Sequence, residues 1–499
     1  MKTRYLGCLL PILFGAWLCE AVQAADQYLF KDGYPTREAA QAAREDADYQ
    51  RAVMAYRFWY PTVSAEGIFN GNRSVGVGDN QSFNIAATGP HQVGFTLNSD
   101  TPYGSGVIDV KNGPMVIELP PGPYIGVVND HHQGWVLDMG LPGPDAGKGG
   151  KHLVLPPGYQ GQTPDGYYAA HSATYKNIFA VRAVPNKGDL QGAMNALRGV
   201  KVYPLADATN PHPLAVIDTT EKFMDSTCLK WEDNLKFWEV LHQVIEAEPI
   251  SQKFLPMYGL LSAVGIEKGK PFAPDARMKG ILERAARAGR DQMLVSAFAS
   301  ARADRIAWPD RAWEWAGLVP GSAQFETPAG MDLEARDRWF VQAIATSPAM
   351  FLRSEGAGSL YWLGLRDTSG AYLDGDKSYK LTVPQPVPGK LFWSVTVYDA
   401  QTRSQVQTDQ DKAALRSMFE LKDASGTGPL DLYFGPTAPQ GKESRWIKTV
   451  PGKGWFTYFR IYGPERSAFD GSWKPGDFEA LPNPPLQPTG TPGGKPREL

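Results

Sequence analysis

Two histidines and an aspartate stand at the end of an apolar run in VVNDHHQGWVLDMG, residues 127–140. Along a β-strand the side chains alternate between faces, so Asp130 and His132 would share one face and His131 would point to the other. With a rise of ~3.3 Å per residue, their Cβ atoms would lie roughly 6–7 Å apart. A carboxylate at that range can orient an imidazole as a general base requires. The structural alternative is that Asp130 caps a turn and both histidines lie at a solvated strand end.

A second polar group precedes a proline in LNSDTPY, residues 97–103. The short side chains of Asn98, Asp100 and Thr101 suit an Asx turn, which ties the backbone to itself. If the fold brings this loop beside residues 130–132, Asp100 would supply a second carboxylate and Tyr103 a proton donor. The N-terminal residues expected to contact a substrate at such a site are Asn98, Thr101, His131 and Trp135.

The C-terminal half contributes a cation after the strand-like run LFWSVTV. Arg403, with Gln407 close behind it, could clamp a carboxylate, phosphate or sulfate group through two parallel hydrogen bonds. The alternative is an internal ion pair of Arg403 with Asp399 or with Asp409. Three further cations read as solvated charges in this sequence: Arg445, Arg460 and Lys474.

A metal site would need three or four converging oxygen or nitrogen ligands. The available side chains are those of Asp100, Asp130, His132 and Asp138, but the chain has no HExxH, no cysteine pair and no calcium-loop spacing. We therefore expect no cofactor and leave a metal open. The mildly acidic chain has no basic block, and we expect no nucleic-acid partner.

The first 24 residues, MKTRYLGCLLPILFGAWLCEAVQA, have the pattern of a secretory signal peptide: Lys2 and Arg4, an apolar run, then Val22-Gln23-Ala24. The apolar run is shorter than the ~20 residues that a membrane span needs and contains Pro11. We expect a periplasmic or secreted protein with no membrane anchor after cleavage. Only Cys228 would remain in the mature chain, so no intramolecular disulfide is expected.

The composition and the pattern of apolar residues change several times along the chain. Helix formers dominate the region up to residue 60, and short β-rich runs bounded by Gly, Pro or Asn follow, as in a sandwich or barrel. A helical pattern precedes a second β-rich region, and a polar, proline-rich tail closes the chain. The expected segments are a signal peptide (1–24), a helical segment (25–60), a β domain (61–215), a helical linker region (216–345), a second β domain (346–480) and a disordered tail (481–499).

Long runs of the chain resemble a bacterial two-domain family. The run from LNSDTPYGSGVIDV to KHLVLPPGYQG resembles domain of unknown function 1254. The runs KLFWSVTVYDAQTRSQVQTDQDKAALRSMFEL and SRWIKTVPGKGWFTYFRIYGPERSAFDGSWKPGDFE resemble its usual partner, domain of unknown function 1214. The resemblance implies a mainly β fold with helices, of class α+β, in which two β-sandwich or jelly-roll-like domains are joined and flanked by helices. It implies no activity, cofactor or catalytic residue.

Two functions follow as hypotheses. The first is an exported hydrolase acting on a small or anionic envelope-derived substrate in an interdomain cleft, with His132 as base, Asp130 orienting it, Asp100 and Tyr103 assisting, and Arg403 holding the substrate. The second is a non-catalytic periplasmic protein that binds a carbohydrate or other small ligand, or that has a structural role in the envelope. Both hypotheses have a small molecule or glycan as ligand, and the sequence leaves the oligomeric state open.

Overall fold

The computed structural model describes residues 28–356, 358–423 and 428–482, and the chain divides into two units, residues 1–48 and 49–499. In the first unit, strands β1 (Phe30–Lys31) and β2 (Tyr34–Pro35) pair antiparallel, and helix α1 (Arg37–Ser74) begins. The predicted signal peptide lies outside the described residues. Of the predicted tail, Leu481 ends a strand and residues 483–499 lie outside the described part.

The N-terminal β region contains two packed sheets. A six-stranded sheet has the order β13–β3–β5–β11–β7–β8, formed by β3 (Ser82–Ala86), β5 (Tyr103–Asp109), β7 (Tyr124–Asp130), β8 (Trp135–Gly140), β11 (Lys176–Ala183) and β13 (Ala215–Asp218). A four-stranded sheet has the order β10–β9–β6–β12, formed by β6 (Met115–Leu119), β9 (Gly150–Leu155), β10 (Tyr167–His171) and β12 (Lys201–Pro204). Side chains from both sheets share one core that includes Ile108, Ile117, Val128, Val154 and Phe179. Helix α2 (Leu190–Arg198) adds Met194 and Leu197 to it.

Apart from α2, the α-helices of the described residues in the second unit share a separate core. They are α3 (Lys236–Ala247), α4 (Leu255–Ala263), α5 (Ala276–Phe298), α6 (Leu333–Phe340) and the short α7 (Pro348–Phe351), together with α1 from residue 49 onward. Aspartates accept hydrogen bonds from backbone N–H groups at the start of α2, α5 and α6, as helix N-caps do. The buried aromatic rings of Tyr56, Trp59, Trp238 and Trp339 lie in this helical core.

The C-terminal β region is a second pair of packed sheets. A five-stranded antiparallel sheet has the order β15–β18–β24–β20–β21, formed by β15 (Trp313–Trp315), β18 (Ser359–Gly364), β20 (Gly389–Asp399), β21 (Ala414–Arg416) and β24 (Trp455–Pro464). The other has the order β23–β22–β19–β25, formed by β19 (Ser378–Val383), β22 (Leu430–Gly435), β23 (Trp446–Lys448) and β25 (Phe478–Leu481). Two further two-stranded pairs are β4 (Gln92–Val93) with β14 (Met224–Asp225), and β16 (Glu326–Thr327) with β17 (Gly330–Met331).

The predicted α+β class with two β-sandwich regions is confirmed. Helix α1 runs past the predicted end at residue 60 and contains Pro61. A proline inside a helix frees the carbonyl four residues earlier, here that of Arg57. One residue further on, the carbonyl of Phe58 accepts a hydrogen bond from Nη1 of Arg336 at 2.6 Å. Local propensity alone would end the helix before Pro61. In the structure the helix continues through Pro61, and a side chain from α6 bonds to a carbonyl beside the interrupted hydrogen bond.

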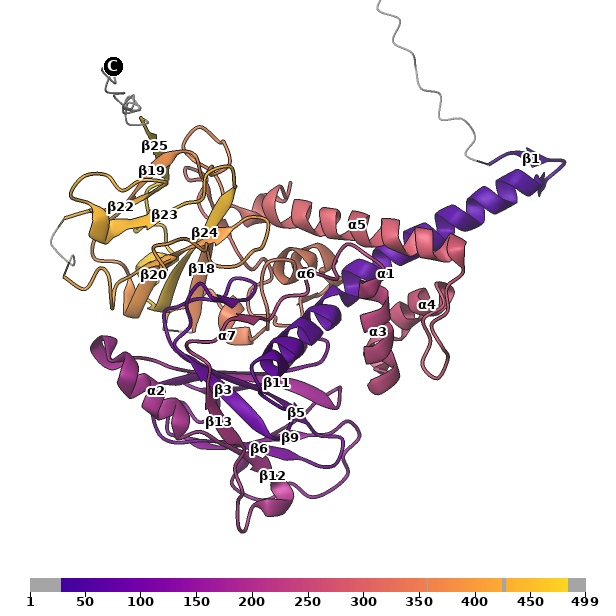
Figure 1. Cartoon of the computed structure of the whole chain (residues 1–499), viewed down its shortest axis with the longest axis horizontal. Coiled ribbons are helices and arrows are strands. Elements are labelled where there is room, and N and C mark those ends of the chain that lie inside the picture. Colours follow the sequence, from indigo (N-terminus) through magenta and orange to yellow (C-terminus); the bar gives the residue numbers. More distant parts are fainter. Residues whose placement is uncertain (1–27, 357, 424–427, 483–499) are drawn as a thin grey trace, which may run out of the picture. The chain divides into compact units, whose positions relative to one another are not determined.

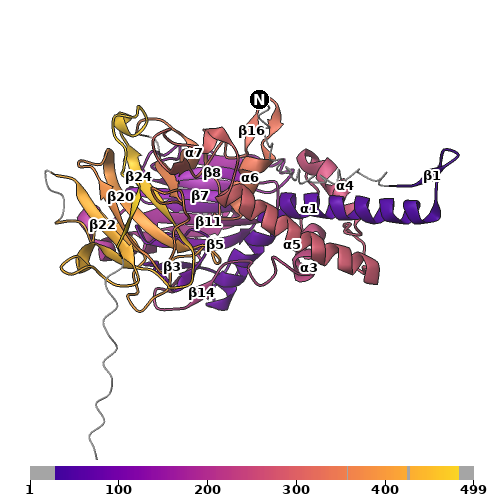
Figure 2. The same ribbon diagram turned by 90° about the horizontal axis from the view of Figure 1, so that it is seen from above.

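The segment 95–101, which we call the crossing segment, belongs to the N-terminal β region and packs on the five-stranded C-terminal sheet. The N–H of Thr96 donates to the carbonyl of Arg403 at 2.8 Å, and the carbonyl of Thr96 accepts from Nη2 of Arg460 at 2.9 Å. The carboxylate of Asp100 accepts from the hydroxyl of Ser394 at 2.9 Å. Figures 1 and 2 both show β20 and β24 beside the strands of the N-terminal sheet.

Candidate functional site

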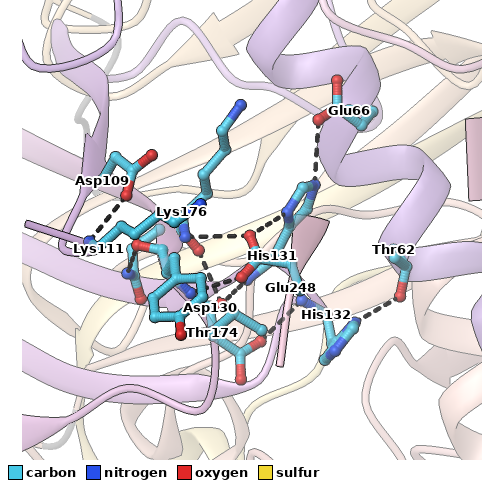
Figure 3. A network of polar contacts seen from close by, with 12 residues as sticks. Thr62, Glu66, Asp109, Lys111, Asp130, His131, His132, Thr174, Lys176 and Glu248 are labelled. Carbon is cyan, nitrogen blue, oxygen red and sulfur yellow. Dashed lines mark hydrogen bonds and ion pairs between the residues drawn. The ribbon is translucent and has the colours of Figure 1, made fainter. Parts of the chain in front are cut away.

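Asp130 is a turn residue in the structure. Strand β7 ends at Asp130, and its Oδ1 accepts hydrogen bonds from the backbone N–H groups of His132 and Gly134, both at 2.8 Å (Figure 3). Burial raises the pKa of Asp130 to about 6, against the opposing effect of these two N–H groups. Asp130 therefore caps a turn, as the structural alternative in the sequence analysis proposed. Its carboxylate bonds to main-chain N–H groups and not to an imidazole.

His132 lies in the interior. Its Nδ1 is 2.9 Å from the hydroxyl of Thr62 (Figure 3). Its ring packs against Trp59 and Phe254, with centroids 5.2 Å and 6.0 Å away. Burial, helped by the charges of His131 and Arg336, lowers its pKa to about 3. Nε2 is buried and has no hydrogen-bond partner among the described residues. This neutral ring in an aromatic environment does not lie where the predicted general base would have to be.

His131 joins two glutamates from distant helices. Nδ1 is 2.9 Å from Oε1 of Glu248, and Nε2 is 3.2 Å from Oε1 of Glu66 in α1 (Figure 3). Burial opposes protonation, but the two carboxylates prevail and raise the pKa of His131. Glu248 also accepts from the N–H groups of Tyr175 and Lys176, at 2.6 Å and 3.1 Å. The network connects α1, the end of α3 and the start of β11, which indicates a structural cross-link.

The polar residues around Asp100 lie at the crossing segment. The carboxylate of Asp100 is fully buried, and its Oδ2 accepts from the hydroxyl of Tyr462 at 3.1 Å as well as from Ser394. The hydroxyl of Thr101 accepts from Nε of Arg182 at 2.8 Å. Nδ2 of Asn98 donates to the hydroxyl of Tyr103 at 2.7 Å. Asp100 is therefore tied to the C-terminal β region, whereas Thr101 and Asn98 bond within the N-terminal β region, and none of these hydrogen bonds reaches the turn at residues 130–132.

Arg403 is an interior ion-pair residue. Its Nη2 is 2.7 Å from Oε2 of Glu232, and its guanidinium lies 4.6 Å from the ring centroid of Phe95. Neither predicted partner takes this place, since Asp399 pairs with Lys453 at 3.0 Å and Asp409 with Lys448 at 2.6 Å. A glutamate 171 residues away in sequence neutralises the cation, so Arg403 is not available to clamp a substrate.

The remaining predicted side chains also have structural partners. Trp135 is 37% exposed, and its Nε1 donates to Oδ1 of Asp138 at 3.1 Å. Burial raises the pKa of Asp138 to about 6, although Ser347 and Trp135 donate to it. Gln407 donates to the carbonyl of Pro90 at 3.1 Å. Within the described residues there is no group of three or more His, Cys, Asp or Glu side chains arranged to hold a metal ion.

A cavity of about 410 Å³ lies among the described residues, and it does not unite the predicted residues. Asn98 and Tyr103 line it. The other predicted residues do not: Asp100, Thr101, Asp130, His131, His132, Trp135, Arg403 and Gln407. The convergence of His132, Asp100 and Arg403 on one pocket, which the hypothesis required, is therefore not present.

The cavity lies between the two β regions. On one side, alternate residues of β11 point into it, namely Ile178, Ala180 and Arg182, since residues two apart share a face of a strand. On the other side, Tyr458 and Arg460 of β24 do the same. Apolar side chains from α1, β7, α6 and the segment that follows α6 also line it, among them Ile68, Ile125, Val127, Trp339, Ile344 and Met350. Amide groups of Asn72, Asn84 and Asn98 lie in the lining as well. Exposed residues that line it include Leu141, Lys390 and Leu391.

Two arginines form the polar end of this cavity, and both were missed from sequence. Arg182 donates from Nη2 to the hydroxyl of Tyr462 at 2.8 Å, and Arg460 donates from Nη1 to Thr396 at 3.2 Å. Arg460 is 2% exposed, so the expectation of a solvated charge is wrong. The signal was a single cation inside an otherwise apolar, β-patterned run, in NIFAVRAV and in WFTYFRIYG. Such a cation must be neutralised or have a function, because buried charges are costly.

Comparison with known proteins gives a family and a fold. The family model described as protein of unknown function (DUF1254) matches residues 80–204, and the one described as protein of unknown function (DUF1214) matches residues 358–466. No curated protein matches the chain. Among the described residues, no helix has both the length and the apolar character needed to cross a membrane.

Two solved structures are similar to this chain over most of its length. The crystal structure of the VPA0106 protein from Vibrio parahaemolyticus has a TM-score of 0.55 at 16% sequence identity, over 87% of this chain and 100% of that chain. An uncharacterized protein from Burkholderia cenocepacia has a TM-score of 0.39 at 13% identity, over 88% of this chain and 96% of that chain. The first of these matches shows a shared fold and nothing more.

Proposed function

We propose that this protein, which belongs to the proteins that carry a DUF1254 domain followed by a DUF1214 domain, binds a small and largely apolar molecule between its two β regions. The observation that supports this most directly is the cavity of about 410 Å³. Ligand sites in proteins are commonly concave, of roughly 300–1,000 Å³, apolar in most of their lining and polar at a few points. This cavity has each of these properties.

The lining is suited to an apolar molecule. Small side chains at Ala86, Ser105 and Ala180 leave the face of the N-terminal sheet open, and larger apolar groups such as Ile178 and Met350 enclose the space. Removing an apolar ligand from water stabilises the complex by roughly 25 cal/mol per Å² of buried apolar surface, before the costs of association. The exposed residues Lys390 and Leu391 in the lining offer an entry path.

Titration with N-phenyl-1-naphthylamine, a neutral fluorophore that brightens in apolar surroundings, tests this function. We expect saturable binding of about one probe per chain. Ala180→Trp would fill the cavity from β11 and should weaken binding at least tenfold. Val295→Trp is the matched control, because Val295 is 58% exposed on α5 and does not line the cavity. Absence of saturable binding, or equal binding by the two variants, would contradict the proposal.

We propose further that binding takes place outside the cytoplasm. The support is the signal-peptide pattern in residues 1–24, with cleavage after Ala24. Expression of the full chain in a bacterium, followed by osmotic-shock fractionation and N-terminal sequencing, tests it. The expected result is a mature chain that begins at Ala25 in the shock fluid. A chain that keeps Met1 and stays with the cytoplasm would refute export.

Hydrolysis, the other function expected from sequence, stays a prediction. The base that it relied on, His132, is buried against Trp59 and Phe254 and does not line the cavity. The non-catalytic, ligand-binding hypothesis therefore has the better structural support, and it is the one that the experiments above address.

A further inference from the structure

We infer that the ligand is an amphipathic monoanion, with its charged group, such as a carboxylate, held by Arg182 and Arg460 and its apolar body in the rest of the cavity. This inference rests on the proposed function and names the chemical class of the ligand. It follows from the partners of the two arginines, from unused polar atoms beside them, and from the balance of charge at that end of the cavity.

Arg182 and Arg460 are buried cations without a carboxylate against them. Among the described residues, neither guanidinium lies in an ion pair; the groups that surround them are hydroxyls, a backbone carbonyl and aromatic rings. Three other arginines are buried among the described residues: Arg338 pairs with Glu314 at 2.8 Å and Arg403 with Glu232 at 2.7 Å, whereas Arg336, which does not line the cavity, donates to the carbonyl of Phe58. Buried charges are normally paired, so the two cavity arginines have the environment of a site that awaits an anion.

Polar atoms without partners lie at the same end of the cavity. Nε of Arg460 and the hydroxyl of Tyr458 are buried and make no hydrogen bond within the described residues, and both side chains line the cavity. Tyr103 also lines it, and its hydroxyl oxygen already accepts from Asn98, which leaves its own proton free to donate. A buried polar group without a partner costs free energy. A bound carboxylate can accept hydrogen bonds from donors of this kind.

The charge at this end of the cavity favours a ligand with one negative charge. Two guanidiniums face a single carboxylate, Asp100, which reaches Arg182 only through the hydroxyl of Tyr462. Lys390 also lines the cavity, but it is exposed and pairs with Glu355 at 3.7 Å. One positive charge therefore remains unbalanced. A monoanion neutralises it, whereas a phosphomonoester, with about −1.5 to −2 charges at pH 7, would leave an excess of negative charge.

The volume limits the size of the ligand. Since a water molecule takes about 30 Å³ of the liquid, a cavity of about 410 Å³ holds on the order of a dozen heavy atoms. Decanoate, a carboxylate on an unbranched alkyl chain, is of this size. Its headgroup would lie at the arginines and its chain along the apolar lining formed by side chains such as Ile125, Val127 and Ile344.

Calorimetric titration with four ligands that share one alkyl chain tests the inference: decanoate, 1-decanol, decylamine and decyl phosphate. We expect decanoate to bind at least tenfold more tightly than 1-decanol, decyl phosphate to bind more weakly than decanoate, and decylamine to bind weakest. If decanoate and 1-decanol bind equally well, Arg182 and Arg460 do not recognise an anionic group, and this inference fails while the proposed function stands. If none of them binds and the neutral fluorophore does not bind either, the proposed function itself fails.

Two variants assign the effect to the arginines. Arg460→Met and Arg182→Met remove the charge and keep an unbranched apolar side chain; each should reduce decanoate binding at least tenfold and leave 1-decanol binding within about twofold. Because binding of 1-decanol reports an intact cavity, selective loss of the acid cannot come from misfolding. Unchanged decanoate binding in both variants would overturn the inference. Should either variant fail to fold, the ratio of acid to alcohol affinity in the wild-type protein still decides the matter.

Discussion

Arg182 and Asp100 are joined through one hydroxyl group. The hydroxyl of Tyr462 accepts from Nη2 of Arg182 at 2.8 Å and donates to Oδ2 of Asp100 at 3.1 Å. Strand β11 supplies the cation, strand β24 the hydroxyl and the crossing segment the carboxylate. The charged end of the cavity is thus held by hydrogen bonds that connect both β regions.

Removal of this hydroxyl should destabilise the protein. Tyr462→Phe leaves Nη2 of Arg182 without its acceptor and Oδ2 of Asp100 with Ser394 as its remaining donor. We expect a loss of about 1–3 kcal/mol in the free energy of unfolding, because both groups are buried. Urea unfolding measures it. Tyr372→Phe is the control, since Tyr372 is 48% exposed and should change stability by less than about 0.5 kcal/mol. A Tyr462→Phe protein as stable as the control would contradict this assignment.

Two glycines of α5 should respond in opposite ways to alanine. A Cβ atom built at Gly289 would lie 2.3 Å from Cδ1 of Tyr56, whose hydroxyl is fixed by a 2.6 Å hydrogen bond to the carbonyl of Glu232. Gly289→Ala should therefore cost about 1–3 kcal/mol of stability through overpacking. At Gly280 nothing lies within 4 Å, so Gly280→Ala should stabilise the helix by about 0.5–1 kcal/mol. Thermal denaturation of the two variants checks the expected opposite signs, and equal shifts would refute the packing argument.

The buried pair of Arg403 and Glu232 should behave as a unit. Either Arg403→Met or Glu232→Gln leaves a buried group without its partner, and each should cost about 3–5 kcal/mol. The double variant should cost clearly less than the sum of the two, because the second change removes a group that the first has already isolated. Chemical denaturation of all four proteins gives the coupling energy.

The surface pair of Lys236 and Glu239, 48% and 43% exposed, provides the matched cycle and should yield a coupling of about 0–1 kcal/mol. If the interior and surface pairs gave the same coupling energy, the structural role assigned to Arg403 would be wrong.

His131 should make stability depend on pH above neutrality. Its pKa is raised from 6.5 in the folded state by Glu248 and Glu66, against the opposing effect of burial. The folded state therefore keeps a proton that the unfolded state loses. The resulting stabilisation is fully present below pH 6.5 and disappears as the pH rises through the raised pKa of His131.

Thermal melts of the wild type and of His131→Gln between pH 5 and 9 test this. The difference in Tm between the two proteins should be largest near the acidic end of that range and should shrink toward pH 9. At its maximum it should correspond to a loss of the order of 3 kcal/mol in the free energy of unfolding. His212→Gln, at an exposed position, should follow the wild type throughout. A difference that grows with pH would have the wrong sign for a raised pKa.

The elements with clear periodicity were predictable from sequence. The runs LFWSVTVYD and WFTYFRIYG correspond to the buried strands β20 and β24, and α5 lies within the predicted helical linker region, residues 216–345. Pro61 marks where local reasoning failed, because it reads as a helix terminus while α1 continues to Ser74. Tertiary contacts outweigh the local preference at such a position.

The site was far less accessible than the fold. The pairing of Asp130 with His132 assumed that the strand continued, but β7 ends at Asp130 and Gln133 has a φ of +57°, so the alternation of faces no longer applies. Arg182 and Tyr462 are 280 residues apart in sequence, and no local pattern predicts that distant strands meet. The sequence did contain a lone cation within each of two apolar strands. These two arginines line the cavity, whereas the adjacent histidines do not.

The crossing segment has a consequence for how such a protein can be inherited. Thr96 and Asp100, in the stretch matched by the first family model, accept hydrogen bonds from Arg460, Ser394 and Tyr462 in the stretch matched by the second. A gene fragment that encoded one stretch alone would produce a chain whose sheet surface, normally covered by the other stretch, is exposed to water. Such a chain should be prone to aggregation. The two stretches should therefore be inherited as one unit when genes recombine. Replacing one stretch with that of a distant relative should be tolerated only when the other stretch is replaced as well.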